Sequence, residues 1–250
     1  MNRSSYVSDW SPVSPARYSE AQDAERAYWS IQDPRHLFLQ AAYHVYAGYY
    51  AWKEHRALLD PFGVNPASPR NFQIPSSAMA GRSVLDVGCG PMTHSLSLVH
   101  CAEVHAVDPL ADFHRERQPF GWDFFRSVSA VGAEELPFER GRFDFVYCWN
   151  VLDHVRDAGR VLSEIGRVLA DDGELLLGCD VRPRGGGGSA HPYKWTREAL
   201  EDQVLAEWTP ATPIQLLDDL RNPIAPDQPE PEQIMWASRL RRRGRPAAAG

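Results

Sequence analysis

The stretch VLDVGCGPMTHS, residues 84–95, joins a short apolar run to a glycine-rich turn. An apolar run of this length that ends in a turn is typical of a strand buried on both faces of a parallel sheet. Gly88 and Gly90 follow the run at once, and glycine in such a turn lets the backbone approach a ligand closely. The stretch therefore predicts a buried strand with a ligand at its carboxyl end.

Strand and helix signals alternate beyond this stretch. Apolar or β-branched runs predict further strands over residues 103–109, 127–138, 142–150 and 174–181, with a turn at Asp171, Asp172 and Gly173 before the last of these. Helical spacing predicts helices over 93–102, 110–118, 156–169 and 196–205. Residues 212–217 and 233–240 read as two closing strands. The pattern predicts an α/β fold with a Rossmann-like, mostly parallel seven-stranded sheet, helices on both faces and a helical N-terminal extension.

The composition divides the chain into four parts. Residues 1–20 are rich in Ser and Pro and are expected to be flexible, and residues 21–78 form a helical, aromatic N-terminal cap and a linker. Residues 79–240 form the ligand-binding domain, and residues 241–250 are expected to be a disordered basic tail, with a weak anionic contact as the alternative. The four consecutive glycines Gly185–Gly188 predict a mobile loop or lid.

Charge and cysteine usage exclude several classes of protein. The net charge of −7 over 250 residues gives no basic surface, so no nucleic-acid partner is expected. No apolar run is long enough to span a membrane, and the first twenty residues lack the apolar core of a secretory signal. The four cysteines have no CxxC spacing, so neither a metal site nor a disulfide framework is expected, and a cytoplasmic setting is the simplest interpretation. The sequence does not indicate an oligomeric state.

Two aspartates narrow the choice of ligand. Asp108 ends the second predicted strand, where a carboxylate can accept hydrogen bonds from both hydroxyls of a ribose. Thr93 stands where a dinucleotide fingerprint has its third glycine. Asp86 precedes the first glycine, and its carboxylate would repel a pyrophosphate but suit an ammonium or a sulfonium group. A nucleoside cofactor with a positive charge is therefore indicated.

Residues 83–182 resemble the class I S-adenosylmethionine-dependent methyltransferases, and within them the type that acts on small molecules. LDVGCG (85–90) is similar to the first motif of that family, and AVDP (106–109) to the acidic end of its second strand. AEELPF (133–138) with FDFVYCWNVLDHV (143–155) resembles the adenine-binding and fourth-strand motifs. IGRVLADDGELLLG (165–178) resembles the helix and fifth strand that follow.

The resemblance implies S-adenosylmethionine as the cofactor and assigns its contacts by position. The chain departs from the family at Gly132, where many relatives have an acid, and at Met92, where many have a glycine. The implied contacts are Asp86, Gly88, Cys89 and Gly90 beside the methionine part, Asp108 on the ribose, Pro109, Leu110, Ala133 and Glu134 at the adenine, and Asn150 and Val151 near the sulfonium.

The expected reaction is methyl transfer to an oxygen or nitrogen of a small-molecule acceptor. A hydroxyl acceptor must lose a proton, and histidine is the usual base near neutral pH. His154 is one candidate base, with Asp153 as the residue that could orient it, although His154 could instead cap the next helix or border the cofactor. His191, after the glycine loop, is the second candidate. Pocket walls are expected from Tyr43, Tyr46 and Trp149, although core packing explains these aromatic residues equally well.

Two other classes of function stay open at this point. A nicotinamide-dependent oxidoreductase would use the same strand geometry, but Asp86 and the missing third glycine disfavour it. A non-catalytic binding protein could keep the fold, but it would not need both Asp86 and Asp108. Methylation of nucleic acid lacks the NPPY-like or DPPY-like stretch, because CWNV stands after the fourth strand.

Overall fold

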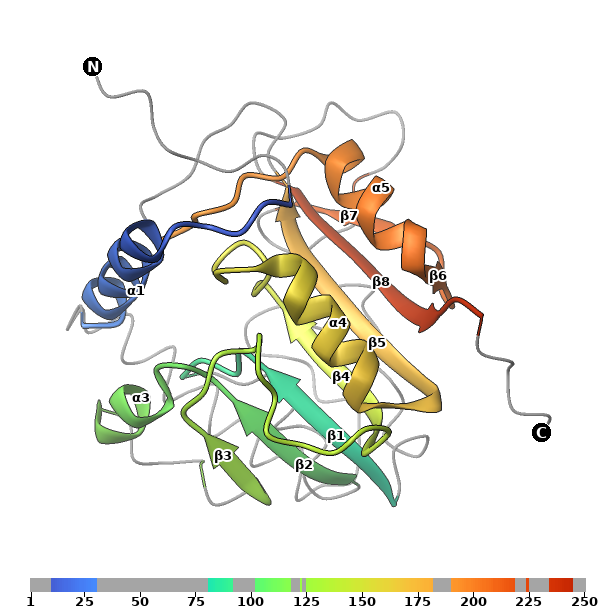
Figure 1. Ribbon diagram of the computed structural model, residues 1–250, viewed down its shortest axis with the longest axis horizontal. Helices are drawn as coiled ribbons and strands as arrows, with labels where there is room; N and C mark the ends of the chain where they lie inside the picture. Colours follow the sequence, from blue (N-terminus) through green and yellow to red (C-terminus); the bar gives the residue numbers. More distant parts are fainter. Residues whose placement is uncertain are drawn as a thin grey trace.

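The architecture was obtained as a computed structural model, which describes residues 10–30, 81–91, 102–117, 122, 125–181, 190–218, 224 and 234–244. These residues form a single eight-stranded sheet with helices packed around it (Figure 1). Most of the helical cap and linker expected over residues 21–78, nearly all of the helix expected over 93–102, and the glycine loop lie outside the described residues.

The first five strands form a parallel half-sheet in the order β3-β2-β1-β4-β5. The chain runs outward from β1 to β3 and then returns to the other side of β1 with β4. Ligands in open α/β sheets bind outside the carboxyl ends of the strands at such a reversal, which here lies between β1 and β4. The strands are β1 (Arg82–Val87), β2 (Ala102–Val107), β3 (Ser127–Ser129), β4 (Phe143–Trp149) and β5 (Leu169–Val181).

The apolar run that opens the glycine turn is buried on both faces, as predicted. Val84, Leu85 and Val87 are all 0% exposed. Leu85 and Val87 belong to the larger core cluster, whereas Val84 belongs to a second cluster. Because successive side chains of a strand point to opposite faces, β1 contributes to the core on both sides of the sheet.

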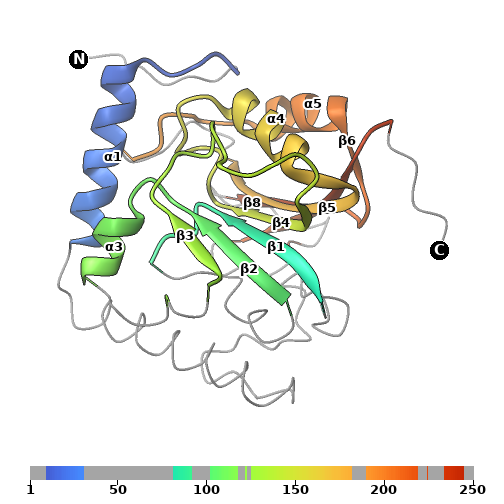
Figure 2. The same ribbon diagram turned by 60° about the horizontal axis from the view of Figure 1, so that its bottom comes forward.

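The described helices divide between one face of the sheet and its carboxyl edge. Helices α4 (Ala158–Val168) and α5 (Arg197–Glu207) lie over the same face, and α1 (Pro15–Trp29) and α3 (Ala111–Arg117) lie beyond the carboxyl ends of the parallel strands (Figures 1 and 2). Helix α4 starts at the cap residue Asp157, whose side chain accepts a hydrogen bond from the Arg160 amide. Its apolar residues at helical spacing, Val161, Ile165 and Val168, are 0% exposed, as predicted.

The sheet closes with antiparallel strands. Strand β8 (Ile234–Arg242) pairs with β5 on one side and with β6 (Trp208–Pro210) and β7 (Gln215–Leu217) on the other. The expected closing strands correspond to β7 and β8, but β6 was not predicted. The described sheet therefore has eight strands instead of seven, because two short segments share one edge of β8.

Three expected boundaries are corrected by the structure. The turn predicted at Asp171, Asp172 and Gly173 is an irregular part of β5, where the pairing with β4 shifts register. Helix α1 begins at Pro15, capped by Ser14, so residues 15–20 are helical and the flexible segment expected over residues 1–20 is too long. Arg241 and Arg242, expected in the disordered tail, are the last residues of β8.

None of the helices in the described part of the chain is long and apolar enough to cross a membrane.

Candidate active site

The glycine turn after β1 has the backbone conformation that the sequence predicts. Gly88 and Gly90 have φ angles of 68° and 54°, in the region that favours glycine. The amides of Gly88 and Cys89 both donate to the carbonyl of Val107, 2.8 and 3.2 Å away, which ties the turn to the end of β2. A side-chain carbon at Gly90 would meet no atom of the described residues within 4 Å, so these residues leave space beside Gly90. The buried carboxylate of Asp86 lies just before the turn in β1.

Asp108 faces this turn from the carboxyl end of β2. Its Oδ2 accepts a hydrogen bond from the Gly90 amide at 2.9 Å, and its Oδ1 accepts one from the Leu110 amide at 2.7 Å. Each oxygen keeps lone-pair capacity for a further donor. Burial raises the pKa of Asp108 above its ordinary value and lowers that of the neighbouring His114, whose Nε2 is 4.0 Å from Oδ1. The predicted ribose-binding carboxylate is therefore held beside the turn, with Pro109 and Leu110 next to it.

The carboxyl end of β4 borders the same turn. Asn150 has a φ of 59°, uncommon outside glycine, and its amide donates to the carbonyl of Gly178 at 2.8 Å. Its side-chain Oδ1 is buried without a hydrogen-bond partner among the described residues. Val151 packs so closely on Gly88 that a side-chain carbon there would lie 2.4 Å from Val151 Cγ2. Trp149 packs against Gly178.

Glu134 has contacts that the sequence did not suggest. It is 7% exposed, and its Oε1 accepts hydrogen bonds from the amides of Arg156 and Asp157 at 2.8 and 3.2 Å. This carboxylate therefore anchors the segment that leads into α4. Ala133 is buried in the larger core cluster. The adenine contact of Ala133 and Glu134 stays a prediction.

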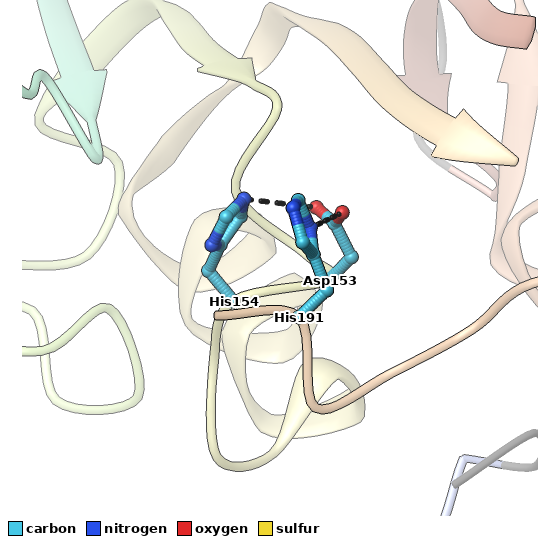
Figure 3. Close-up of side chains that lie close together, drawn as sticks. All are labelled: Asp153, His154 and His191. Atoms are coloured by element: carbon cyan, nitrogen blue, oxygen red, sulfur yellow. Dashed lines mark hydrogen bonds and ion pairs between the residues drawn. The ribbon is translucent and has the colours of Figure 1, made fainter. Parts of the chain in front are cut away.

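Both candidate bases, His154 and His191, gather around the carboxylate of Asp153, and we call these three residues the acid–histidine cluster (Figure 3). Asp153 Oδ2 is 2.7 Å from His191 Nδ1, and Asp153 Oδ1 is 3.7 Å from His154 Nε2. The two imidazole rings lie 4.3 Å apart, centroid to centroid. Asp153 is 2% exposed, so its carboxylate does not face solvent. Asp153 and His154 follow β4, and His191 follows β5.

Helix α1 adds a carboxylate to this cluster. Glu25 Oε1 is 2.8 Å from His154 Nδ1, and Glu25 Oε2 accepts a hydrogen bond from Trp29 Nε1 at 2.9 Å. Arg17, also on α1, donates a hydrogen bond from its guanidinium to the His191 carbonyl at 3.3 Å. The alternative that His154 caps α4 is not what the structure shows, because Asp157 caps that helix.

The charges of this cluster shift its ionisation. Burial alone would lower the pKa of His154, but the carboxylates of Asp153 and Glu25 outweigh burial and raise it to about 9. Burial alone would raise the pKa values of Asp153 and Glu25, but both fall below their ordinary values because each faces His154, and Asp153 also faces His191. The site therefore stabilises positive charge between two carboxylates.

Helix α1 connects the acid–histidine cluster with the glycine turn. Glu25 contacts His154, and one turn later the Trp29 ring meets the His114 ring edge-on at 5.9 Å. His114 in turn faces Asp108. No local motif around Glu25, Trp29 or His114 indicates a role for them, so these residues could not be found from the sequence. Tyr43 and Tyr46, the other expected pocket walls, lie outside the described residues.

The described residues fit S-adenosylmethionine on two observations. Among the described residues, the space beside Gly90 is unfilled, and a side chain at this position would occupy it. The buried Asn150 Oδ1 at the end of β4 has no hydrogen-bond donor among the described residues, so a ligand could supply one. Asp86 provides the negative charge that suits an ammonium or sulfonium group. The residues that would hold the cofactor are those of the glycine turn together with Asp86, Asp108 and Asn150.

Comparison with known sequences agrees with this fit. Residues 85–177 match the family model described as "Methyltransferase domain". The tRNA U34 carboxymethyltransferase of Serratia proteamaculans is 36% identical over 107 residues, which make up 40% of this chain and 33% of that protein. The enzyme of the same name from Aeromonas salmonicida is 37% identical over 107 residues, with the same two coverages of 40% and 33%. The chain thus spans about a third of the length of the curated relatives that it matches.

Two solved structures share the fold. The 1,6-didemethyltoxoflavin-N1-methyltransferase of Burkholderia thailandensis, solved with S-adenosylhomocysteine, is 20% identical with a TM-score of 0.53, over 93% of this chain and 94% of that one. The geranyl diphosphate C-methyltransferase of Streptomyces coelicolor A3(2), also solved with S-adenosylhomocysteine, is 18% identical with a TM-score of 0.50, over 69% of this chain and 77% of that one.

The family match covers the glycine turn, the strand that ends in Asp108, and the strand that leads to the acid–histidine cluster. A nicotinamide-dependent oxidoreductase is therefore no longer a competing interpretation. Residues 85–177 are therefore a methyltransferase domain, as the resemblance to the class I S-adenosylmethionine-dependent methyltransferases implied.

Proposed function

We propose that the chain transfers a methyl group from S-adenosylmethionine to an oxygen or nitrogen of a small-molecule acceptor. The observation that carries this proposal is the acid–histidine cluster at the carboxyl end of β4, next to Val151, which packs on the glycine turn. A proton acceptor near the cofactor is what a hydroxyl or ammonium acceptor requires, because the nucleophile must lose its proton.

The cofactor supplies an electrophilic methyl group on a sulfonium. The chain contributes alignment and proton removal, and alignment of reacting atoms alone can contribute about 7–11 kcal/mol. We assign proton removal to His191. Its Nδ1 lies 2.7 Å from Asp153 Oδ2, so a neutral ring donates from Nδ1 to the carboxylate and keeps the Nε2 lone pair for the acceptor proton. His154, whose pKa is raised to about 9, is charged at neutral pH and does not compete for that proton.

Two kinds of methyl acceptor are compared, a small molecule and tRNA. The net charge of −7 disfavours a phosphate backbone, whose binding depends on positive side chains. The enzyme from Burkholderia thailandensis, which shares the fold over nearly the whole chain, is an N1-methyltransferase of 1,6-didemethyltoxoflavin, a small molecule. The matched tRNA U34 carboxymethyltransferases make tRNA the alternative acceptor that has to be tested.

Calorimetric titration tests the cofactor assignment first. S-adenosylmethionine and S-adenosylhomocysteine should bind, NADH should not, and Asp108→Ala should weaken both at least tenfold. Asp112→Ala is the matched control, because the Asp112 side chain is 73% exposed on α3. Absence of binding in the wild type would leave a non-catalytic protein of the same fold.

The acceptor test follows S-adenosylhomocysteine production with a panel of hydroxyl and amine compounds and, separately, with total tRNA. Turnover of a small molecule, reduced at least 100-fold in His191→Ala with S-adenosylmethionine binding intact, is the expected result. Turnover with tRNA alone would overturn the small-molecule assignment.

A further inference from the structure

The acid–histidine cluster has the composition and shape of a metal site as well as of a proton acceptor. We propose that Asp153, His154 and His191 bind one divalent transition-metal ion, with Glu25 holding His154 in place. No metal was expected from the sequence, because the four cysteines have no CxxC spacing, whereas these ligands come from two loops and their support from a helix.

The distances between the ligand atoms suit a single ion. One ring nitrogen or carboxylate oxygen from each of the three residues lies within 4.8 Å of the other two. Ligands about 2.0–2.2 Å from a tetrahedral ion lie about 3.3–3.6 Å from one another. The separations of 3.7 Å from Asp153 Oδ1 to His154 Nε2 and 2.7 Å from Asp153 Oδ2 to His191 Nδ1 bracket that value. These two separations involve different oxygens of Asp153, so the carboxylate reaches the two histidines on its two sides.

Asp153 gives a second, independent indication of a ligand. The residue is 2% exposed, and its Oδ1 accepts no hydrogen bond from any described residue. His154 Nε2 is 3.7 Å from this oxygen, which is beyond hydrogen-bond distance. A buried carboxylate oxygen without a partner is costly, so buried charges are normally paired or bind a metal. Figure 3 shows the Asp153 carboxylate beside both imidazole rings.

Glu25 provides the outer support that metal-binding histidines usually have. A histidine ligand commonly donates its other ring N–H to a carboxylate, which fixes the tautomer and the ring orientation. Glu25 Oε1 lies 2.8 Å from His154 Nδ1 in an ion pair whose angle falls outside that of a hydrogen bond, and this contact leaves Nε2 as the ligand atom. Trp29 Nε1 donates to the other oxygen of Glu25 and holds that carboxylate in turn.

Charge and donor type identify the class of ion. Asp153 and Glu25 together carry two negative charges, which balance a divalent cation when both histidines are neutral. Imidazole and carboxylate ligands suit Zn²⁺, Co²⁺, Fe²⁺ or Mn²⁺. Three protein ligands leave an open position, as in catalytic metal sites.

The open position suggests what the ion would do, and this step rests on the proposed function. An acceptor hydroxyl bound there would have a lowered pKa and would release its proton to solvent before attacking the methyl carbon. In the metal-loaded protein His191 would then be a ligand, and the base role assigned to it above would apply only to the metal-free protein.

The test is metal binding by the whole chain, without cofactor or acceptor, so its result is independent of the proposed function. The protein is treated with EDTA, freed of chelator, and titrated with Zn²⁺ by calorimetry and with Co²⁺ by visible absorption. We expect one ion per chain, with the intense visible bands of four-coordinate Co²⁺. His191→Ala and Asp153→Asn should weaken binding at least 100-fold and tenfold, and Glu25→Gln about 10–100-fold.

The matched control is His105→Asn, because His105 also pairs with a carboxylate, Glu103, at 2.8 Å, but lies on β2 away from the cluster. Its metal affinity should equal that of the wild type. Binding of S-adenosylhomocysteine and the far-ultraviolet circular dichroism spectrum confirm that each variant is folded. Absence of stoichiometric binding, or binding that His191→Ala leaves unchanged, would overturn the proposal. Failure of the methyl-transfer assay alone would overturn only the proposed function.

Discussion

Two glycines of the same turn have different reasons to be glycine. Gly88 and Gly90 share a left-handed backbone, but only Gly88 is in close contact with another side chain, that of Val151. Gly90 faces open space next to Asp108. The first glycine therefore serves packing, and the second serves the space that a ligand needs.

Substitution should separate these two roles. Gly88→Ala should lower the free energy of unfolding by about 2–5 kcal/mol, because about 1–2 kcal/mol of backbone strain adds to the overlap with Val151. Gly90→Ala should lower the free energy of unfolding only by the backbone strain of about 1–2 kcal/mol. It should, however, weaken S-adenosylhomocysteine binding at least tenfold. Gly81→Ala is the control for Gly90→Ala, since Gly81 has a φ of 73° and equally open surroundings but lies before β1. Urea unfolding and calorimetry measure both quantities, and equal cofactor affinities of the Gly81 and Gly90 variants would contradict the prediction.

The raised pKa of Asp108 has a consequence for stability in the absence of cofactor. Because burial raises this pKa above the ordinary value of about 3.9, the folded state keeps the proton to a higher pH than the unfolded state does. The free energy of unfolding therefore falls as pH rises from about 4 through the raised pKa. Asp108→Asn should remove this part of the pH dependence, as measured by urea unfolding at a series of pH values, whereas Asp112→Asn should not. The same slope in all three proteins would show that Asp108 titrates normally.

The residues predicted from the sequence are those that lie at short, fixed distances from a strand end. Gly88, Gly90 and Asp108 follow directly from strands that the apolar pattern reveals. Glu25 could not be found in this way, because only the packing of α1 across the carboxyl ends of the sheet brings it to His154. Asp153 was considered as the orienting partner of His154, but its short hydrogen bond is to His191, from another loop.

At the level of elements, Arg239 and Arg241 near the end of β8 stabilise the pairing of β8 with β5. Arg239 and Arg241 project from β8 and each donate two hydrogen bonds to a different oxygen of Glu174 in β5. The sequence analysis interpreted the arginine run as a solvated tail, because composition does not reveal a partner on a neighbouring strand. Strand β6 was missed for a related reason, since three residues are too few to show an alternating pattern.

Glu174 should therefore matter more than either arginine. Glu174→Gln should lower the free energy of unfolding by about 1.5–3 kcal/mol, because charged hydrogen bonds to a carboxylate that is only 10% exposed are lost. Arg241→Ala should cost less than about 1 kcal/mol, because its side chain is 53% exposed. Urea unfolding measures both, with the exposed Glu139→Gln as the control. A larger loss for Arg241→Ala than for Glu174→Gln would contradict this account.

At the scale of the whole molecule, cofactor binding should stabilise the entire fold. The proposed contacts come from the ends of β1, β2 and β4, which are central strands of the sheet. A ligand at 100 times its Kd adds about 2.7 kcal/mol to the free energy of unfolding. For a chain of this size, S-adenosylhomocysteine should raise the Tm by roughly 5–10 °C in a thermal melt. Asp108→Ala, with at least tenfold weaker binding, should show about half that rise or less at the same concentration, and a similar rise with NADH would count against the cofactor assignment.

The position of β8 has a consequence for how the protein is made. Strand β8 lies between β5 and β6, although β6 precedes it along the chain. During synthesis on the ribosome, β1 to β5 can pair as they emerge, but β6 and β7 have no sheet edge to join until β8 has been translated. A nascent chain halted before residue 234 would therefore expose the edge of β5, and such an edge readily pairs with another chain. Completion of the sheet is thus a late event in the biosynthesis of this enzyme, when chaperones would be most needed.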